Sequence, residues 1–190
     1  MKKIGILAIQ GDFERHGNIL GKLKVKVLQV RTEGELKQTD GLVIPGGEST
    51  TFLKLFQEFK LEKSIKEYAK NKPILGTCAG LIILSKEAKP LPYKPLGLID
   101  IKVFRNAYGR QRESFVDDID LNINGKASKY PGVFIRAPKI IQIGQNVKVL
   151  ARHKDDIVLV SQQNILAATF HPELTDNTEI HKYFIDDFIH

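Results

Sequence analysis

Short apolar runs alternate with amphipathic stretches along the N-terminal half of the 190-residue chain. Apolar runs bounded by turn residues predict buried strands, and apolar positions three and four residues apart predict helices. The predicted strands are residues 4–9, 25–30, 41–44 and 73–75. The predicted helices are residues 12–23, 49–59 and 61–70, and a further helix whose apolar first part is residues 81–84. Because strands and helices alternate, we predict a parallel sheet with helices on both faces.

The pattern changes in the second half of the chain, where the segment 89–97 contains three prolines and interrupts the alternation. Residues 99–170 then predict several strands, including 132–135, 147–151, 157–161 and 165–170. Residues 177–189 predict a last helix with one apolar face. No repeat or linker divides the chain. We therefore predict one domain over residues 1–190, with a three-layer, doubly wound and mostly parallel α/β sheet.

The single cysteine lies where a predicted strand turns into a predicted helix. Gly76 and Gly80 flank Thr77, Cys78 and Ala79, which gives Gly-x-Cys-x-Gly, the thiol form of a nucleophile elbow. The glycines allow a tight turn, and the backbone N–H groups at a helix start favour the thiolate. A lone cysteine is more often a small buried apolar residue. The flanking glycines and the strand-to-helix junction favour a nucleophile here.

A glycine pair follows the strand predicted at residues 41–44 and therefore lies at the edge of the sheet where strands end. In the sequence Pro-Gly-Gly-Glu-Ser-Thr, Gly46 and Gly47 free backbone N–H groups to approach a ligand, which suits an oxyanion hole. A tight turn into a helix is the simpler alternative. A phosphate-binding loop is less well supported, because the spacing and the lysine that such loops use are missing.

A histidine and a glutamate follow the strand predicted at residues 165–170. Only Pro172 separates His171 from Glu173, and this spacing can direct a carboxylate at an imidazole. A thiol nucleophile needs a base for its proton, and the base needs a partner that fixes its tautomer. Residues 78, 171 and 173 therefore form a candidate triad that the fold has to assemble.

The other four histidines show no acidic partner in the sequence, and we expect them to be surface or satisfied side chains. His16 and His181 fall in predicted helices, His153 in a predicted loop and His190 at the end of the chain. No grouping of histidine, cysteine and acidic residues has a spacing typical of a metal site. We expect no metal and no cofactor.

Charge and cysteine content narrow the class of protein further. The 29 Lys and Arg exceed the 22 Asp and Glu and give a formal charge of +7. The lysines are scattered, mostly beside acids, and no basic run alternates with stacking aromatics, so we expect no nucleic-acid partner. One cysteine excludes an internal disulfide and favours a reducing compartment. Without a signal-peptide core or an apolar run of ~20 residues, we expect a cytoplasmic protein with no membrane partner.

These motifs together resemble the class I glutamine amidotransferases and, more narrowly, the glutaminase subunits of pyridoxal 5'-phosphate synthase. The resemblance covers nearly the whole chain, in segments 5–12, 45–51, 76–82, 105–111, 134–138 and 170–175. The elbow and the His-x-Glu spacing mark the superfamily, whereas the sequences at 105–111 and 134–138 are typical of this branch. The resemblance implies a flavodoxin-like fold. Phe104 and Arg112 depart from the pattern of the branch.

The resemblance implies that Cys78 attacks the side-chain amide of L-glutamine, that His171 transfers protons and that Glu173 orients His171. Residues expected to hold the oxyanion through backbone N–H groups are Gly46, Gly47 and Ala79. Residues expected to contact glutamine are Gly47, Glu48, Ser49, Arg105, Ile135 and Arg136. Gln10 is expected to couple partner docking to the oxyanion loop.

The resemblance also implies a partner. Ammonia would pass to a separate synthase subunit that makes pyridoxal 5'-phosphate, in an assembly of twelve synthase and twelve glutaminase subunits, and this chain would bind no pyridoxal phosphate itself. Two alternatives stay open. The chain is either an amidotransferase subunit of another pathway, such as histidine or tryptophan biosynthesis, or a catalytically silent subunit that uses the fold only to dock.

Overall fold

The computed structural model describes residues 1–107 and 114–190. The end of the 105–111 motif and the departure at Arg112 lie outside the described residues. The helical elements are α1 (Phe13–Gly21), α2 (Glu33–Lys37), α3 (Ser49–Glu58), α4 (Leu61–Tyr68), α5 (Ala79–Leu84), the 3₁₀ turn η2 (Pro172–Leu174), α6 (Glu179–Tyr183) and the π-helical turn η3 (Phe184–Phe188). The strands are β1 (Lys3–Leu7), β2 (Lys26–Val30), β3 (Gly41–Ile44), β4 (Ile74–Thr77), β5 (Ser85–Lys89), β6 (Ile99–Phe104), β7 (Ser114–Ile123), β8 (Lys126–Ile135), β9 (Lys139–Ile143), β10 (Lys148–His153), β11 (Asp156–Gln162) and β12 (Ile165–Ala168).

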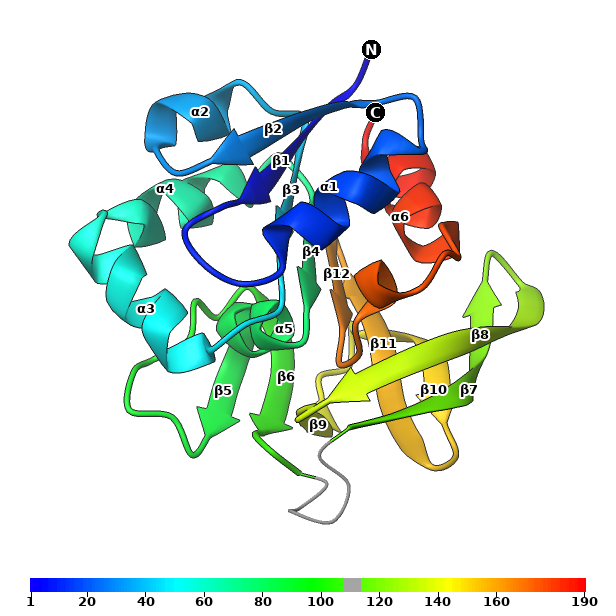
Figure 1. The fold of residues 1–190 in the computed structure, drawn as a ribbon. Coiled ribbons are helices and arrows are strands. Elements are labelled where there is room, and N and C mark those ends of the chain that lie inside the picture. Colours follow the sequence, from blue (N-terminus) through cyan, green and yellow to red (C-terminus); the bar gives the residue numbers. More distant parts are fainter. Residues whose placement is uncertain (108–113) are drawn as a thin grey trace.

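A nine-stranded sheet forms the centre of the molecule, with strand order β2-β1-β3-β4-β12-β11-β10-β7-β8 (Figure 1). The strands from β2 to β12 in this order are parallel, and the remaining four are joined by antiparallel pairs. A smaller sheet, β5-β6-β9, lies beside it. The expected doubly wound α/β architecture is therefore confirmed, and the long β7–β8 hairpin extends it on one side.

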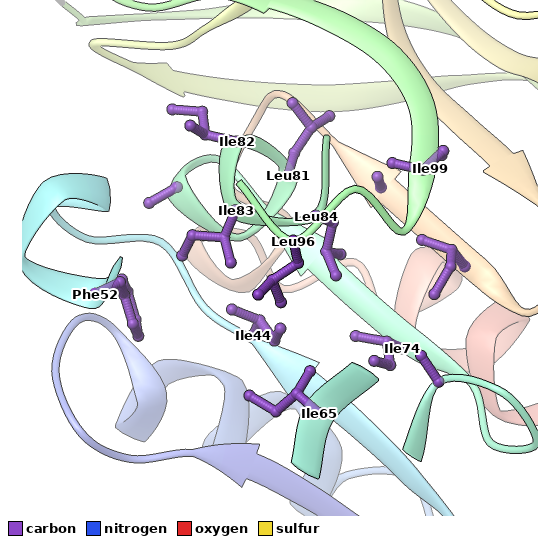
Figure 2. Packing of buried hydrophobic residues seen from close by; sticks show 14 of the residues in the cluster. Ile44, Phe52, Ile65, Ile74, Leu81, Ile82, Ile83, Leu84, Leu96 and Ile99 are labelled. Atoms are coloured by element: carbon purple, nitrogen blue, oxygen red, sulfur yellow. The ribbon is translucent and has the colours of Figure 1, made fainter. Parts of the chain in front are cut away.

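Successive residues of the central strands point into two different hydrophobic cores, as the two-residue period of a strand requires. Leu42 and Ile44 of β3 belong to one core and Val43 belongs to the other. The first core lies under α2 to α5 and the small sheet, and the second lies under α1, α6 and η3. Figure 2 shows Ile83 and Leu84 of α5 gathered with Ile44 in the first core. All six residues of α5 are buried, which fixes the elbow that precedes this helix.

Several element boundaries differ from the sequence prediction for local reasons. The first strand ends at Leu7 rather than at residue 9, because the chain then turns towards the glycine loop, where the Asp12 N–H donates to Gly46 O at 3.1 Å. The helix after the elbow starts at residue 79 and ends at Leu84, because the next residue already begins β5. The last helix starts at Glu179, whose backbone N–H donates to the side-chain oxygen of Asn177 at 2.9 Å. From residue 184 the helix becomes π-helical.

The prediction missed α2 and placed one histidine wrongly. Helix α2 is only five residues long and depends on a capping box between Thr32 and Glu35. His153 ends strand β10 rather than lying in a loop, and its Nε2 lies 2.9 Å from the Asp117 carboxylate. In the described part of the chain, no helix is long and apolar enough to cross a membrane.

Candidate active site

The elbow is present at the end of β4, where the sequence placed it. Cys78 is the N-cap residue of α5 and has φ +48° and ψ −103°, a strained conformation for a residue with a Cβ. A Cβ on Gly80 would overlap the Ile44 carbonyl oxygen, and a Cβ on Gly76 would lie 2.8 Å from the carbonyl carbon of Gly80. Both glycines are therefore required by the close approach of backbone and helix around this turn.

The Cys78 thiol lies in a defined environment at this turn. Its Sγ is 3.8 Å from the carbonyl oxygen of Ile135, at the end of β8, and the thiol is close enough to the imidazole of His171 to raise the pKa of that ring. The Cys78 backbone N–H donates to Ala168 O at 2.9 Å. That bond ties the elbow to the end of β12, the strand that leads directly to His171.

His171 and Glu173 contact each other as their spacing predicted. The distance between His171 Nδ1 and Glu173 Oε1 is 2.7 Å, and both side chains are buried. Pro172 starts the 3₁₀ turn η2 between them. The His171 backbone N–H donates to Val133 O at 2.8 Å, which fixes the turn against β8.

The protonation of this pair follows from its contacts. Burial opposes a charge on His171, but hydrogen bonds with Cys78 and Glu173 outweigh burial and raise its pKa to about 10. Burial also opposes the Glu173 carboxylate, yet neighbouring His16 and the hydrogen bond from His171 lower its pKa to about 2. At neutral pH the pair is therefore an imidazolium and a carboxylate.

The glycine loop packs directly against this pair. A Cβ on Gly46 would overlap Cε1 of the His171 ring and would lie 2.9 Å from its Nδ1. Gly47 has φ +153°, and a Cβ there would lie 3.0 Å from the Gln10 amide nitrogen. The Gln10 amide donates to Glu48 O at 2.7 Å. The structure therefore brings Gln10 to the loop that was expected to hold the oxyanion.

The acidic residue of this loop is fixed by its own helix. Glu48 caps α3 by accepting from Thr50 N at 2.9 Å and Thr51 N at 2.7 Å. Burial opposes its charge, but these bonds lower the pKa of the Glu48 carboxyl to about 2. Arg105 donates to Glu48 Oε1 at 3.0 Å and to Pro90 O at 2.9 Å. The carboxylate and the guanidinium thus hold each other at the wall of the site.

One cavity of about 450 Å³ collects most of the predicted site residues. The predicted residues that line it are Gly47, Glu48, Ser49, Cys78, Arg105, Ile135, Arg136 and His171. Gly46, Ala79 and Glu173 are buried and do not line it. Ser49 is 2% exposed, and its hydroxyl oxygen has no hydrogen-bond partner within the described residues. An unpaired buried hydroxyl beside a cavity is suited to a polar ligand.

The sequence prediction missed other residues at the site. Asp12, Ile82 and Asn106 also line the cavity; each lies in one of the segments that carried the family resemblance, which is the signal that would have found them. His16 and His181 were expected to be surface or satisfied side chains without a recognisable acidic partner, and for His16 the structure provides such a partner. Both are fully buried, and His16 Nε2 lies 3.3 Å from Glu173 Oε2. The contact of His16 with Glu173 depends on the tertiary fold, so no local pattern indicated it.

One group of side chains has the atom spacing of a cation site. Ligand atoms of Asp12, His171 and Glu173 lie within 4.8 Å of one another. The hydrogen bond between His171 Nδ1 and Glu173 already uses both of these groups. An ion bound there would compete with the contact that defines the pair, so we assign the cluster to the cysteine site and not to a metal.

Several known proteins are similar to the chain over nearly its full length. A curated protein named pyridoxal 5'-phosphate synthase subunit PdxT from Thermosipho africanus is 50% identical over 185 residues, with 97% of each chain covered. A protein of the same name from Brevibacillus brevis is 48% identical, with 97% of this chain and 96% of the relative covered. A crystal structure described as a glutamine amidotransferase superposes with a TM-score of 0.90 at 42% identity, covering 96% of this chain and 97% of the other.

The fold is that of a glutamine amidotransferase. The chain belongs to the SNO glutamine amidotransferase family, whose model matches residues 6–190. The resemblance drawn from the sequence motifs is therefore confirmed at the level of the family and the fold.

Replacing Glu173 with glutamine should lower the pKa of His171 from about 10, because the imidazolium loses one of the groups that favour its charge while burial continues to oppose it. In the unchanged protein, the raised pKa adds stability that is complete below about 6.5 and disappears as the pH rises through about 10. The variant should lose this stability at a lower pH. Thermal unfolding across pH, with NMR titration of the His171 ring, measures both effects.

Asp117→Asn is the matched control for this prediction, because it removes the carboxylate partner of another buried histidine, His153. It should leave the His171 titration unchanged. An unaltered His171 titration in Glu173→Gln would contradict the assignment of Glu173 as the group that supports the imidazolium.

Proposed function

We propose that the chain hydrolyses L-glutamine to L-glutamate and ammonia through a thioester on Cys78. The observation that supports this most directly is that Cys78 and His171 line one cavity, the thiol raises the pKa of the His171 ring, and Glu173 lies 2.7 Å from that ring. A thiol, a base and an orienting carboxylate are the groups that acyl transfer requires. The names of the relatives and the family description agree with this chemistry.

The first half of the reaction forms the thioester. The thiolate of Cys78 attacks the side-chain carbonyl carbon of glutamine, and the carbonyl oxygen becomes an oxyanion. His171 then donates its proton to the amide nitrogen, the C–N bond breaks and ammonia leaves. Glu173 keeps the imidazole in one orientation and stabilises its positive charge.

The oxyanion needs donors that are in place before charge develops. We assign this role to the backbone N–H groups of Gly46, Gly47 and Ala79, which belong to the loop and the helix start on either side of the thiol. Gln10 fixes the loop through its bond to Glu48 O at 2.7 Å. A change in Gln10 or in the helix after it would therefore reach the oxyanion donors, which suits the coupling role predicted for it.

The second half of the reaction releases glutamate. A water molecule attacks the thioester and gives its proton to His171, now neutral, and the C–S bond breaks. Glutamate leaves, and the thiolate and the imidazolium are restored. One glutamine and one water thus give one glutamate and one ammonia.

The cavity wall carries groups that suit the amino-acid end of glutamine. Arg105 and Arg136 are suited to the α-carboxylate, and Glu48 is suited to the α-ammonium group. Ser49 offers a hydroxyl without an internal partner among the described residues. Gly47 and Ile135 complete the wall next to the thiol. We propose that these residues bind the substrate.

We further propose that the ammonia is delivered to a synthase subunit that makes pyridoxal 5'-phosphate. The support is that both relatives are named as subunits of pyridoxal 5'-phosphate synthase and are similar to the chain over nearly its full length. The predicted assembly of twelve and twelve subunits and a cytoplasmic location belong to the same proposal. One domain over residues 1–190 is proposed because both hydrophobic cores share strands of one sheet.

Ammonia release from glutamine, measured with and without the pyridoxal 5'-phosphate synthase subunit, tests this function. We expect equal amounts of glutamate and ammonia, a rise in rate when the synthase subunit is added, and glutamine-dependent formation of pyridoxal phosphate. If the chain hydrolyses glutamine but the synthase subunit neither binds nor activates it, the chain serves another pathway and the partner proposal is wrong.

Arg105→Lys should raise the KM for glutamine about tenfold and change kcat little. Lysine keeps the charge but loses the planar pair of donors that suits a carboxylate. Steady-state kinetics of glutamine hydrolysis measures both constants. Arg152→Lys is the matched control, because Arg152 is an exposed arginine of β10 that donates to Asp155 O. An unchanged KM in Arg105→Lys would assign Arg105 to the ion pair with Glu48 alone.

A further inference from the structure

Two histidines form a buried cluster behind the proposed triad, and the mechanism above does not use them. His16 comes from α1 and His181 from α6, and both are fully buried. His16 Nδ1 lies 2.9 Å from His181 Nε2. On its other side, His16 Nε2 faces Thr77 Oγ1 at 3.1 Å and Glu173 Oε2 at 3.3 Å.

The contacts of this cluster determine which nitrogen carries the proton. His16 Nε2 is hydrogen-bonded with Thr77 Oγ1, and the carboxylate that it also faces can only accept, so a proton on Nε2 suits both neighbours. His16 Nδ1 then accepts from the N–H of His181 Nε2. His181 Nδ1 is left as an unprotonated acceptor, which agrees with its having no hydrogen-bond partner in the described part of the chain. The opposite tautomers would bury an unpaired N–H at His181 and point a lone pair at the carboxylate.

Both histidines are neutral in this arrangement. Burial is the main cause that lowers the pKa of His16, and burial together with His16 lowers the pKa of His181 to about 3. The charged groups that face His16 are Glu173 and Asp12, which raise its pKa, and His171, which lowers it. A neutral donor is therefore available to Glu173 across the physiological pH range.

Glu173 needs this donor because only one of its oxygens is held by His171. Oε1 accepts from His171, whereas Oε2 has no hydrogen-bond partner within the described residues, and His16 Nε2 lies 3.3 Å from it. A buried carboxylate oxygen without a donor is costly, and the carboxyl then binds its proton more tightly. A protonated Glu173 would no longer support the imidazolium.

We propose that His16 is a positioning residue for glutamine hydrolysis: with its tautomer fixed by His181, it donates from Nε2 to Glu173 and fixes that carboxylate against His171. This inference rests on the proposed glutaminase function. It extends the line of contacts from the cavity to Cys78, His171, Glu173, His16 and His181. Helices α1 and α6, which contribute no residue to the triad, would thereby control the geometry of the base.

Two substitutions of His16 separate this role from packing. His16→Gln keeps an amide N–H at about the place of Nε2, whereas His16→Asn keeps an acceptor near Nδ1 and is too short to reach Glu173. We expect His16→Asn to lower kcat about ten- to a hundredfold with KM unchanged, because a buried charged group loses its donor. His16→Gln should stay within a few-fold of the unchanged protein.

The pH dependence of Cys78 alkylation by iodoacetamide is the second measurement, and it needs neither glutamine nor a partner. The acid limb should move to higher pH in His16→Asn, because Glu173 binds its proton more tightly, and should return in His16→Gln. His153→Asn is the control. It removes another buried histidine bonded to a carboxylate, Asp117, and should lower the melting temperature without moving the acid limb.

The outcomes are distinguishable. If the unchanged protein releases no ammonia with the synthase subunit, the glutaminase proposal fails, and the alkylation profiles still decide the role of His16. If His16→Asn keeps the kcat and the acid limb of the unchanged protein, or if both His16 variants lose activity equally with the acid limb unmoved, the positioning role is wrong. Should His16→Asn fail to fold, His181→Leu removes the donor to His16 Nδ1 and should move the acid limb in the same direction.

Discussion

Cys78→Ala should abolish glutamine hydrolysis and leave the fold intact. The thiol is the proposed nucleophile, and Cys78 is the only cysteine of the sequence, so no other group in the cavity could form a thioester. The rate should therefore fall at least about a thousandfold. The contact of the thiol with Ile135 O is long, at 3.8 Å, so the main loss of stability should be the part that the thiol gives to the His171 imidazolium. Alanine also takes the same backbone conformation as cysteine at φ +48° with similar strain. Ammonia release and thermal unfolding measure the two effects.

A glutamine-analogue electrophile gives an independent readout of the same prediction. The unchanged protein should gain the mass of one covalently bound analogue in the presence of the synthase subunit, and Cys78→Ala should gain none. Cys78→Ser is the matched variant, because the hydroxyl is nearly the same size but a much weaker nucleophile, and it should also lose activity. Full activity in Cys78→Ala would refute the cysteine assignment. An unreactive Cys78 in the unchanged protein would favour a silent docking subunit.

The elbow and the His-x-Glu pair could be predicted because their geometry is local. Two glycines around Cys78 determine a turn within a few residues, and the one-residue spacing of His171 and Glu173 brings their side chains to 2.7 Å. The strand before each motif was also recognisable from its apolar run. Since both strands are parallel in one sheet, the two motifs meet at the same edge.

The parts that sequence patterns did not indicate depend on contacts between distant segments. His16 shares one face of its helix with the buried Ile19 and Leu20, a spacing that is compatible with burial but does not indicate a partner. Its acidic partner is 157 residues away along the chain, counted as 173 minus 16. The hairpin of β7 and β8 was only partly predicted, because many residues of β7 are exposed and acidic. Its importance lies in placing Ile135 beside Cys78.

Glycine is required at position 46 because of a contact with His171, which is far away in the sequence. Gly46 has no need for an unusual backbone conformation, and the sequence suggested only that it frees an N–H group. In the structure its Cα faces the His171 ring, so that a Cβ would overlap Cε1 of that ring. The missing side chain of Gly46 therefore leaves the room that the His171 ring occupies.

Gly46→Ala should therefore lower kcat by about a hundredfold or more while changing stability and KM much less. The added methyl group has to displace the His171 ring, because the loop itself is held by the bond from Asp12 N to Gly46 O at 3.1 Å. The ring cannot turn away without lengthening its 2.7 Å bond to Glu173 or leaving the thiol of Cys78. Misplacing a catalytic group by about 1 Å is enough for a loss of this size.

The matched control is Gly21→Ala, at the last residue of α1, where a Cβ would meet nothing within 4 Å. This variant should keep full activity and melt at the same temperature or slightly higher, because alanine favours a helix over glycine. Kinetics of ammonia release and thermal unfolding of the two variants separate a displaced base from a damaged fold. If Gly46→Ala kept its kcat, the His171 ring would have to stand elsewhere during the reaction. The contact that links the glycine loop to the base would then belong only to the resting state.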